Sequence, residues 1–172
     1  MEILPTGYWT FFCTPERWDI EGFINSAETK TRYKIQKNQK DYFGRKQYGI
    51  ISVLNDNRKN ISPWFYAKQP LKRGIYAIVE ILSDKAILGE SYFDNYSYPE
   101  EDNGQKSYTV EILFRKELLF SPLYTKNISD DLIENHKWLL KGKQGISASV
   151  LQKETFERIL EIGNVPKSKL YT

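Results

Sequence analysis

The sequence predicts an α+β fold, a small mixed β-barrel that is closed and has a helix over one end. Three observations support this prediction. Residues 8–12 form an aromatic run, residues 74–81 form a second apolar run half a chain later, and a short amphipathic segment at residues 20–26 lies between them. Aromatic and β-branched residues favour strands, so we expect both runs to be barrel strands. A barrel of this kind can hold one flat ligand.

The other strands are expected where β-forming residues gather between turn residues. The expected strands cover residues 7–13, 32–35, 48–54, 74–81 and 107–114. Residues 55–73 are expected to be a long connection, and residues 83–106, which are polar and rich in tyrosine, are expected to be irregular. The first of them carries the triplet Trp64-Phe65-Tyr66, and loops longer than about 12 residues are commonly functional.

Helices are expected at three places. Asp19 can cap a helix over residues 20–26, where Ile20, Phe23 and Ile24 share one face. Residues 130–140 are helix-like. Residues 149–162 have the periodicity of an amphipathic helix with Leu151, Phe156, Ile159 and Leu160 inward.

The length of 172 residues predicts a single domain over residues 1–172. Hydrophobic residues make up 40% of the chain and charged residues 27%, which is ordinary globular usage. The longest apolar runs fall well short of the ~18 residues of a spanning helix, and the first residues lack the pattern of a signal peptide. We therefore expect a cytoplasmic protein without a membrane partner.

The net charge is only +3, but the basic residues are clustered. The cluster comprises Lys30, Arg32, Lys34, Lys37, Lys40, Arg45 and Lys46. Carboxylates gather instead at residues 100–102 and 130–131. This distribution predicts one basic face, which allows an anionic partner, although a solvated charged surface has the same pattern.

The sequence gives little support for catalysis. Cys13 and His136 are the only residues of their types, so no zinc site can be assembled from them, and Cys13 is expected to be a buried strand residue. Residues 142–145 lack the length and ending of a phosphate-binding loop. Glu80 and Glu111 could form a carboxylate pair, but many such pairs can be drawn in this chain. We expect no catalytic residue and no cofactor.

Aromatic residues are unusually frequent, at 15% of the chain, and they are interleaved with Lys and Arg. Aromatic rings stack on nucleobases with roughly 1–3 kcal/mol per base, while Lys and Arg hold phosphates. This composition is typical of a nucleic-acid reader that takes a base out of the strand. Packing in the core is the alternative role of such rings, and we expect it for Trp9 and Trp18.

The order of the segments resembles the EVE domain, a member of the PUA-like superfamily related to YTH domains. The matching segments are residues 8–9 with 15–20, 32–35, 48–53, 74–81, 143–147 and 155–159. The resemblance therefore spans nearly the whole chain. It implies a PUA-like barrel that accepts a modified base, such as a methylated cytosine or adenine of DNA or RNA, in an aromatic cage.

The resemblance also implies site residues. Tyr33 stands where such domains often carry a cage tryptophan, and it would sandwich the flipped base with Trp64 or Trp138. The implied base pocket comprises Tyr33, Ile35, Ser52, Trp64, Trp138, Gln144 and Gly145. The implied phosphate-binding residues are Arg45, Lys46, Arg58, Lys141 and Lys143.

Three functions remain open at this level. The first is a non-enzymatic reader of a modified base. The second is a nucleic-acid-processing enzyme that uses carboxylates such as Glu80 and Glu111 with a divalent metal, as some related PUA-like domains do. The third is a module that binds a small molecule or a protein.

Overall fold

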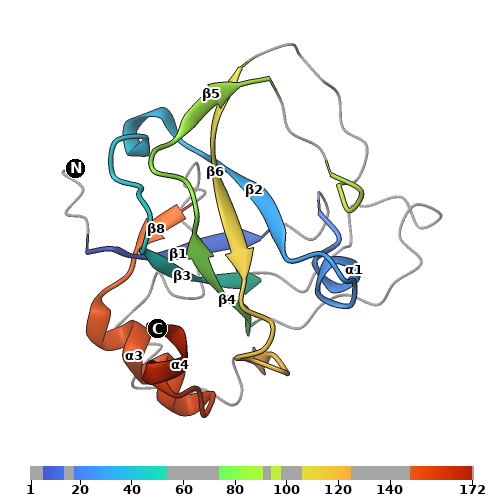
Figure 1. Ribbon diagram of the computed structural model, residues 1–172, viewed down its shortest axis with the longest axis vertical. Coiled ribbons are helices and arrows are strands. Elements are labelled where there is room, and N and C mark those ends of the chain that lie inside the picture. The colour runs from blue at the N-terminus through green and yellow to red at the C-terminus, as the bar shows by residue number, and fades with distance from the viewer. Residues whose placement is uncertain are drawn as a thin grey trace.

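The computed structural model describes residues 6–13, 18–53, 74–90, 94–97, 106–124 and 148–171. The described strands form one mixed sheet, which is flanked by short helices (Figure 1). The elements in chain order are β1 (Tyr8–Cys13), α1 (Ile20–Ile24), β2 (Lys30–Ile35), the 3-10 helix η1 (Lys37–Gln39), β3 (Tyr48–Val53), β4 (Gly74–Ile81), β5 (Ile87–Gly89), β6 (Ser107–Phe114), β7 (Leu123–Tyr124), β8 (Ala148–Val150), α3 (Lys153–Ile162) and α4 (Lys167–Leu170).

The sheet has the strand order β2-β6-β4-β3-β1-β8, with β5 paired to β6 and β7 paired to β4. Strands β1 and β3 are parallel, and the other pairs are antiparallel. The sheet curls into a half-barrel that leaves β2 and β8 at its two ends. The expected closed barrel was therefore wrong in this respect, while the α+β class is confirmed.

Two cores lie on the two faces of the curled sheet. The interior core fills the concave side and includes Trp9, Phe11, Phe23, Val79, Ile112 and Phe114. The outer core lies between the other face and the C-terminal helices, and it includes Tyr48, Ile50, Ile78, Phe156 and Ile159. Side chains alternate between the faces of a strand, so successive residues of β1 and β3 serve different cores.

A β-bulge in β4 modifies this alternation. Ile51 pairs with Ala77, whereas the next residue of β3, Ser52, pairs with Ile75. Tyr76 is thus the extra residue, and both Tyr76 and Ala77 join the interior core. Bulges bend a strand and increase its twist, which helps the sheet to curl at this point.

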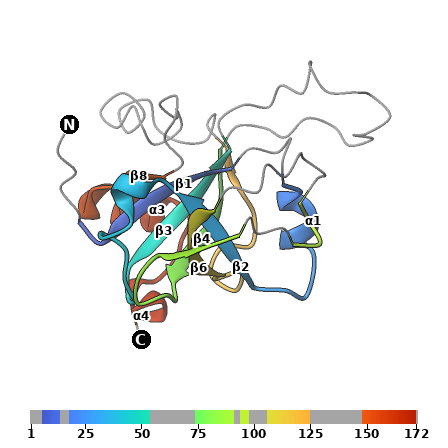
Figure 2. The same cartoon turned by 90° about the horizontal axis from the view of Figure 1, so that it is seen from above.

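The helices lie on opposite sides of the sheet. Figures 1 and 2 both place α1 at one side and the pair α3 and α4 at the other. The side chain of Asp19 caps α1 by accepting a hydrogen bond from Gly22 N, as the sequence predicts. None of the helices that the structure describes is long and apolar enough to cross a membrane.

The segment 94–97 is fastened beside α1 through one carboxylate. Asp94 accepts hydrogen bonds from Trp18 Nε1 at 2.9 Å, from Thr31 Oγ1 at 2.7 Å and from its own turn at Tyr96 N. Trp18 packs against Phe23 of the interior core. The tryptophan therefore has the framework role expected for it, and its indole N–H is satisfied by a residue distant in sequence.

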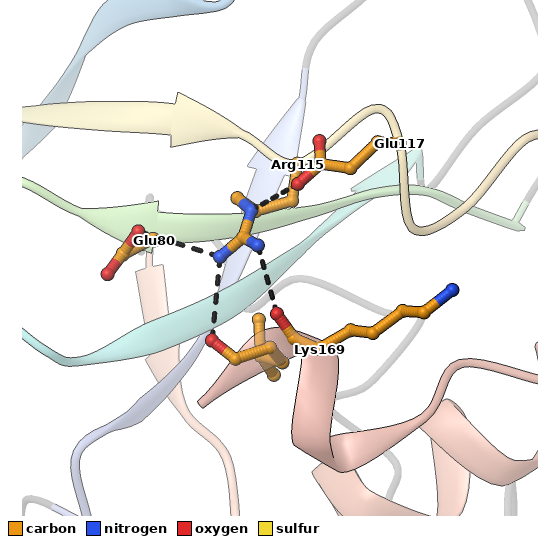
Figure 3. Close-up of polar contacts among 5 residues, drawn as sticks. Glu80, Arg115, Glu117 and Lys169 are labelled. Carbon is orange, nitrogen blue, oxygen red and sulfur yellow. Dashed lines mark hydrogen bonds and ion pairs between the residues drawn. The ribbon is translucent and has the colours of Figure 1, made fainter. Parts of the chain in front are cut away.

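Arg115, which follows β6, fastens the last helix to the sheet (Figure 3). Its guanidinium donates to the carbonyl oxygens of Lys169 at 3.1 Å and Leu170 at 3.5 Å, and it pairs with Glu117 at 2.6 Å and with Glu80 at 3.7 Å. A cation at the carboxyl end of a helix satisfies carbonyls that have no partner within the helix. Arg115 thus contributes to the position of α4, together with the burial of Leu170 in the outer core.

Several elements differ from the sequence prediction. The C-terminal helix begins at Lys153 rather than at residue 149, because Ala148–Val150 pairs with β1 as β8. A short strand, β5, forms within the stretch 83–106 that was expected to be irregular. The strands at residues 74–81 and 107–114 have the expected bounds. The helix expected at residues 130–140 lies outside the described residues.

Candidate nucleic-acid interface

Strand β2 presents two chemically different faces, because its sequence Lys-Thr-Arg-Tyr-Lys-Ile alternates basic with uncharged side chains. Thr31, Tyr33 and Ile35 point inward, and the first and last of these are buried. The cations of Lys30, Arg32 and Lys34 point to the other face, where both lysines are exposed and Arg32 is half-buried. We call these three residues the β2 cation row.

Tyr33 is held in the wall of the half-barrel. Its hydroxyl donates a 2.5 Å hydrogen bond to the carbonyl oxygen of Phe12, and its ring meets the Phe11 ring edge-on at 4.8 Å between centroids. Burial raises the pKa of Tyr33 well above its ordinary value, with a further contribution from Cys13, while the Phe12 hydrogen bond acts in the opposite direction. The hydroxyl is therefore a neutral donor at physiological pH.

Ile35 and Ser52, two further residues of the implied base pocket, are core residues. Ile35 is 3% exposed and belongs to the interior core, and Ser52 on β3 has no exposed surface. Neither side chain presents surface to a ligand in this structure. Ile35 packs in the same core as Tyr33. From a single sequence, a buried side chain of this kind could not be distinguished from one that lines a pocket.

Of the implied phosphate-binding residues, Arg45 and Lys46 lie in the turn before β3. Arg45 Nε forms an ion pair of 2.6 Å with Asp84, and both side chains are exposed. Lys46 is exposed and has a positive φ of 64°. Arg45 is thus partly neutralised by its own chain.

The remaining implied site residues lie outside the described residues. They are Trp64, Trp138, Gln144 and Gly145 of the base pocket and Arg58, Lys141 and Lys143 of the phosphate-binding set.

The β2 cation row was not singled out by the sequence reasoning, although the charge cluster contains it. The row could have been predicted from the spacing of Lys30, Arg32 and Lys34, because basic residues at every second position of a strand lie on one face. No ion pair involves Lys30 or Lys34 within the described part of the chain. The two lysines of the row are therefore available to an external anion.

The cations continue beyond the end of β2. Residues 30–46 contain seven Lys or Arg and one Asp. Lys37 is exposed on η1, and Lys40 Nζ lies 5.6 Å from the ring centroid of Tyr108. A cation above an aromatic face is attracted by the ring. A basic side chain and an aromatic ring therefore lie together at this end of the half-barrel.

One carboxylate of the enzymatic alternative has a charged partner. Glu80 forms an ion pair of 3.7 Å with Arg115 (Figure 3), whereas Glu111 lies opposite Arg32 in the β2–β6 register and forms no ion pair among the described residues. Among the described residues, no group of three or more His, Cys, Asp or Glu side chains is placed to hold a metal ion. Cys13 is buried on β1, as expected, and His136 lies outside the described residues.

These features define a small α+β half-barrel protein with a basic outer strand. Its fold is similar to that of a Rhodopseudomonas palustris protein determined by NMR, with a TM-score of 0.53 at 15% identity over 92% of this chain and 94% of that one. It is also similar to a crystal structure of a Pseudomonas putida protein, with a TM-score of 0.51 at 13% identity over 90% of this chain and 98% of that one. Both are structural genomics targets, and the likeness shows the fold alone. No protein-family model and no curated protein matches the chain.

Proposed function

We propose that this chain is a non-enzymatic nucleic-acid-binding module that recognises a modified base, in the first place a methylated one, flipped out of its strand. The single observation that carries the proposal is the β2 cation row, whose lysines are exposed and form no ion pair within the described residues. Phosphate contacts supply most of the affinity of proteins for nucleic acids, and this strand offers three cations side by side.

The resemblance to EVE domains supplies the second part of the proposal, a PUA-like pocket for the base. Tyr33 lies on the inner face of β2, behind the cation row, and its ring packs against Phe11 of β1. A strand with one phosphate-binding face and one aromatic face would hold the nucleic-acid backbone outside the barrel while a flipped nucleobase comes close to the barrel. Trp64, Trp138, Gln144 and Gly145 would complete the pocket.

Discrimination between a methylated and a plain base is expected to be modest. Burying one methyl group stabilises a complex by about 0.8 kcal/mol, which corresponds to roughly a fourfold difference in Kd. Ser52 and Ile35 would contribute by holding the wall in place, since their side chains are buried.

The test is a panel of DNA and RNA oligonucleotides, each with methylated cytosine, methylated adenine or no modification, titrated by tryptophan fluorescence. We expect one modified strand to bind several-fold more tightly than its plain counterpart. Tyr33→Ala should remove this preference, whereas Lys153→Ala on the exposed start of α3 should leave it unchanged. Equal binding of all strands by the wild-type protein would contradict base recognition, and cleavage of any strand in the presence of a divalent metal would contradict the non-enzymatic assignment.

A further inference from the structure

We infer that the partner is a single-stranded phosphodiester chain that runs along the outer face of β2 and places successive phosphates at Lys30, Arg32 and Lys34. The inference rests on the proposed function and deepens it.

The spacing of the β2 cation row supports this geometry. Alternate residues of a strand lie about 6.7 Å apart on one face, which is comparable to the distance between successive phosphorus atoms along a nucleic-acid strand. One phosphate can therefore meet each cation without a change in the path of the protein backbone. The Arg32 guanidinium is already oriented, because it donates a 3.1 Å hydrogen bond to Thr109 Oγ1.

The neighbouring strand explains why a single strand is favoured over a duplex. In the β2–β6 register, Lys30, Arg32 and Lys34 lie opposite Leu113, Glu111 and Thr109. Residues paired in this way point to the same face of the sheet, so the line of positive charge is flanked by a line with one carboxylate and no cation. A single strand needs one line of charge. The two backbones of a duplex lie about 6–12 Å apart across its grooves, and neither β6 nor β5 offers a second line of cations beside β2.

An apolar side chain lies where the bases would extend. Thr109 pairs with Lys34 on one side and with Ile87 of β5 on the other, so the three side chains form a row across the outer face. Strands are about 4.8 Å apart, which places Ile87 about 10 Å from Lys34 across the sheet. Ile87 is 46% exposed and would offer an apolar surface to the base whose phosphate is held by Lys34.

The inference is tested by comparing two charge-matched triple variants. The first, Lys30→Gln/Arg32→Gln/Lys34→Gln, removes the cation row. The second, Lys153→Gln/Arg158→Gln/Lys167→Gln, removes two lysines and one arginine from exposed positions of α3 and α4. Binding of labelled oligothymidylate and oligouridylate, and of an oligothymidylate–oligodeoxyadenylate duplex, is measured by anisotropy between low and high salt.

The cation-row variant should reduce the slope of log K against log salt by about 2, since each phosphate contact of a single strand contributes about 0.7. The corresponding loss of affinity is on the order of 100-fold at 0.1 M salt. The α3–α4 variant should keep the wild-type slope, and the wild-type protein should bind the single strands more tightly than the duplex.

A double variant guards against loss of the fold. Lys30→Gln/Lys34→Gln retains the Arg32–Thr109 hydrogen bond and should still lower the slope by about 1.4. The inference would be overturned if both triple variants weakened single-strand binding equally, or if the wild-type protein bound the duplex more tightly than the single strands. Either result would leave the proposed function standing. Failure of the wild-type protein to bind any oligonucleotide would overturn both.

Discussion

The side-chain amide of Gln39 joins the two ends of the curled sheet by donating a 2.7 Å hydrogen bond to the carbonyl oxygen of Ala148. Gln39 belongs to η1, which follows β2, and Ala148 opens β8, so the contact connects the end strands across 109 residues of sequence. Gln39 is only 4% exposed, and its oxygen accepts from Gln36 N. Among the described residues, the open side of the half-barrel is thus linked by a side chain rather than by a strand pair.

Replacing Gln39 with Met should weaken this link. The Ala148 carbonyl would lose its side-chain donor in a buried site, which costs about 1–3 kcal/mol of unfolding free energy. Urea denaturation measures the loss, and hydrogen exchange should show faster opening at β8 than at β4. Gln152→Met at an exposed position before α3 serves as the control and should change stability little. An unchanged midpoint for Gln39→Met would show that the link is energetically unimportant.

Tyr33→Phe should lower stability at neutral pH by about 0.5–1.5 kcal/mol, since the hydroxyl no longer donates to Phe12. The substitution should also make the free energy of unfolding less sensitive to alkaline pH. Because the pKa of Tyr33 is raised in the folded protein, the stability that its protonated form contributes is fully present below about pH 10 and is lost as pH rises toward the folded pKa.

Urea denaturation at a series of pH values above neutrality tests this effect. The wild-type protein should lose stability above about pH 10 more steeply than Tyr33→Phe, by up to about 1.4 kcal/mol per pH unit. Some loss should persist in the variant, since burial also raises the pKa of Tyr48 and of Tyr171. Parallel curves for the two proteins would mean that Tyr33 does not titrate differently on folding.

Gly49→Ala should destabilise the pairing of β1 with β3. A Cβ atom at this position would lie 2.7 Å from the carbonyl oxygen of Trp9 and 2.8 Å from Phe11 Cε2, and such overpacking costs about 1–3 kcal/mol. Gly89→Ala is the matched control, because its Cβ would meet nothing within 4 Å. Thermal unfolding followed by circular dichroism compares the two, and equal melting temperatures would contradict the close approach of β1 and β3.

Arg115→Gln should weaken the attachment of α4 to the sheet. The substitution removes the donors to Lys169 and Leu170 and both ion pairs, with an expected loss of about 1.5–3 kcal/mol. Arg158→Gln, which breaks an exposed pair with Glu161, should cost less than about 1 kcal/mol. Urea denaturation and hydrogen exchange at residues 167–170 distinguish the two variants, and equal effects would show that Arg115 does not anchor the helix.

The same substitution should change the response to acid. Partial burial acts to raise the pKa of Glu117, but hydrogen bonding and the charge of Arg115 outweigh it and hold the pKa below its usual value. This contribution is present above the ordinary glutamate pKa of about 4.3 and is lost as pH falls toward the folded pKa. The stability difference between wild type and Arg115→Gln should therefore narrow below about pH 4, and a constant difference would contradict this coupling.

Local patterns predicted the strands because each pattern requires only neighbouring residues. The apolar content of residues 74–81 and the alternation of residues 107–114 gave strand bounds that the structure reproduces. The Asp19 cap of α1 was predicted in the same way. The strand at Ala148–Val150 was missed because its pairing partner is β1, far away in sequence, and three residues do not show a period.

The candidate site was predicted less well for a related reason. Tyr33, Ile35 and Ser52 have side chains that suit a pocket, but whether such a side chain lines a cavity or a core depends on what packs against it. Ser52 proved to be wholly buried, and Tyr33 is fastened to Phe12. The cation row, in contrast, can be predicted from the spacing of Lys30, Arg32 and Lys34 once these residues are known to form a strand.

The sequence by itself determined the α+β class, the main strands and the basic character of residues 30–46, because these depend on residue type and on short-range periodicity. The tertiary structure alone decided that the sheet curls into a half-barrel linked by Gln39 and Ala148, that Tyr33 belongs to the wall, and that the strand paired with the cation row carries no cation. These relationships join residues distant in the chain, and only the packed fold brings such residues into contact.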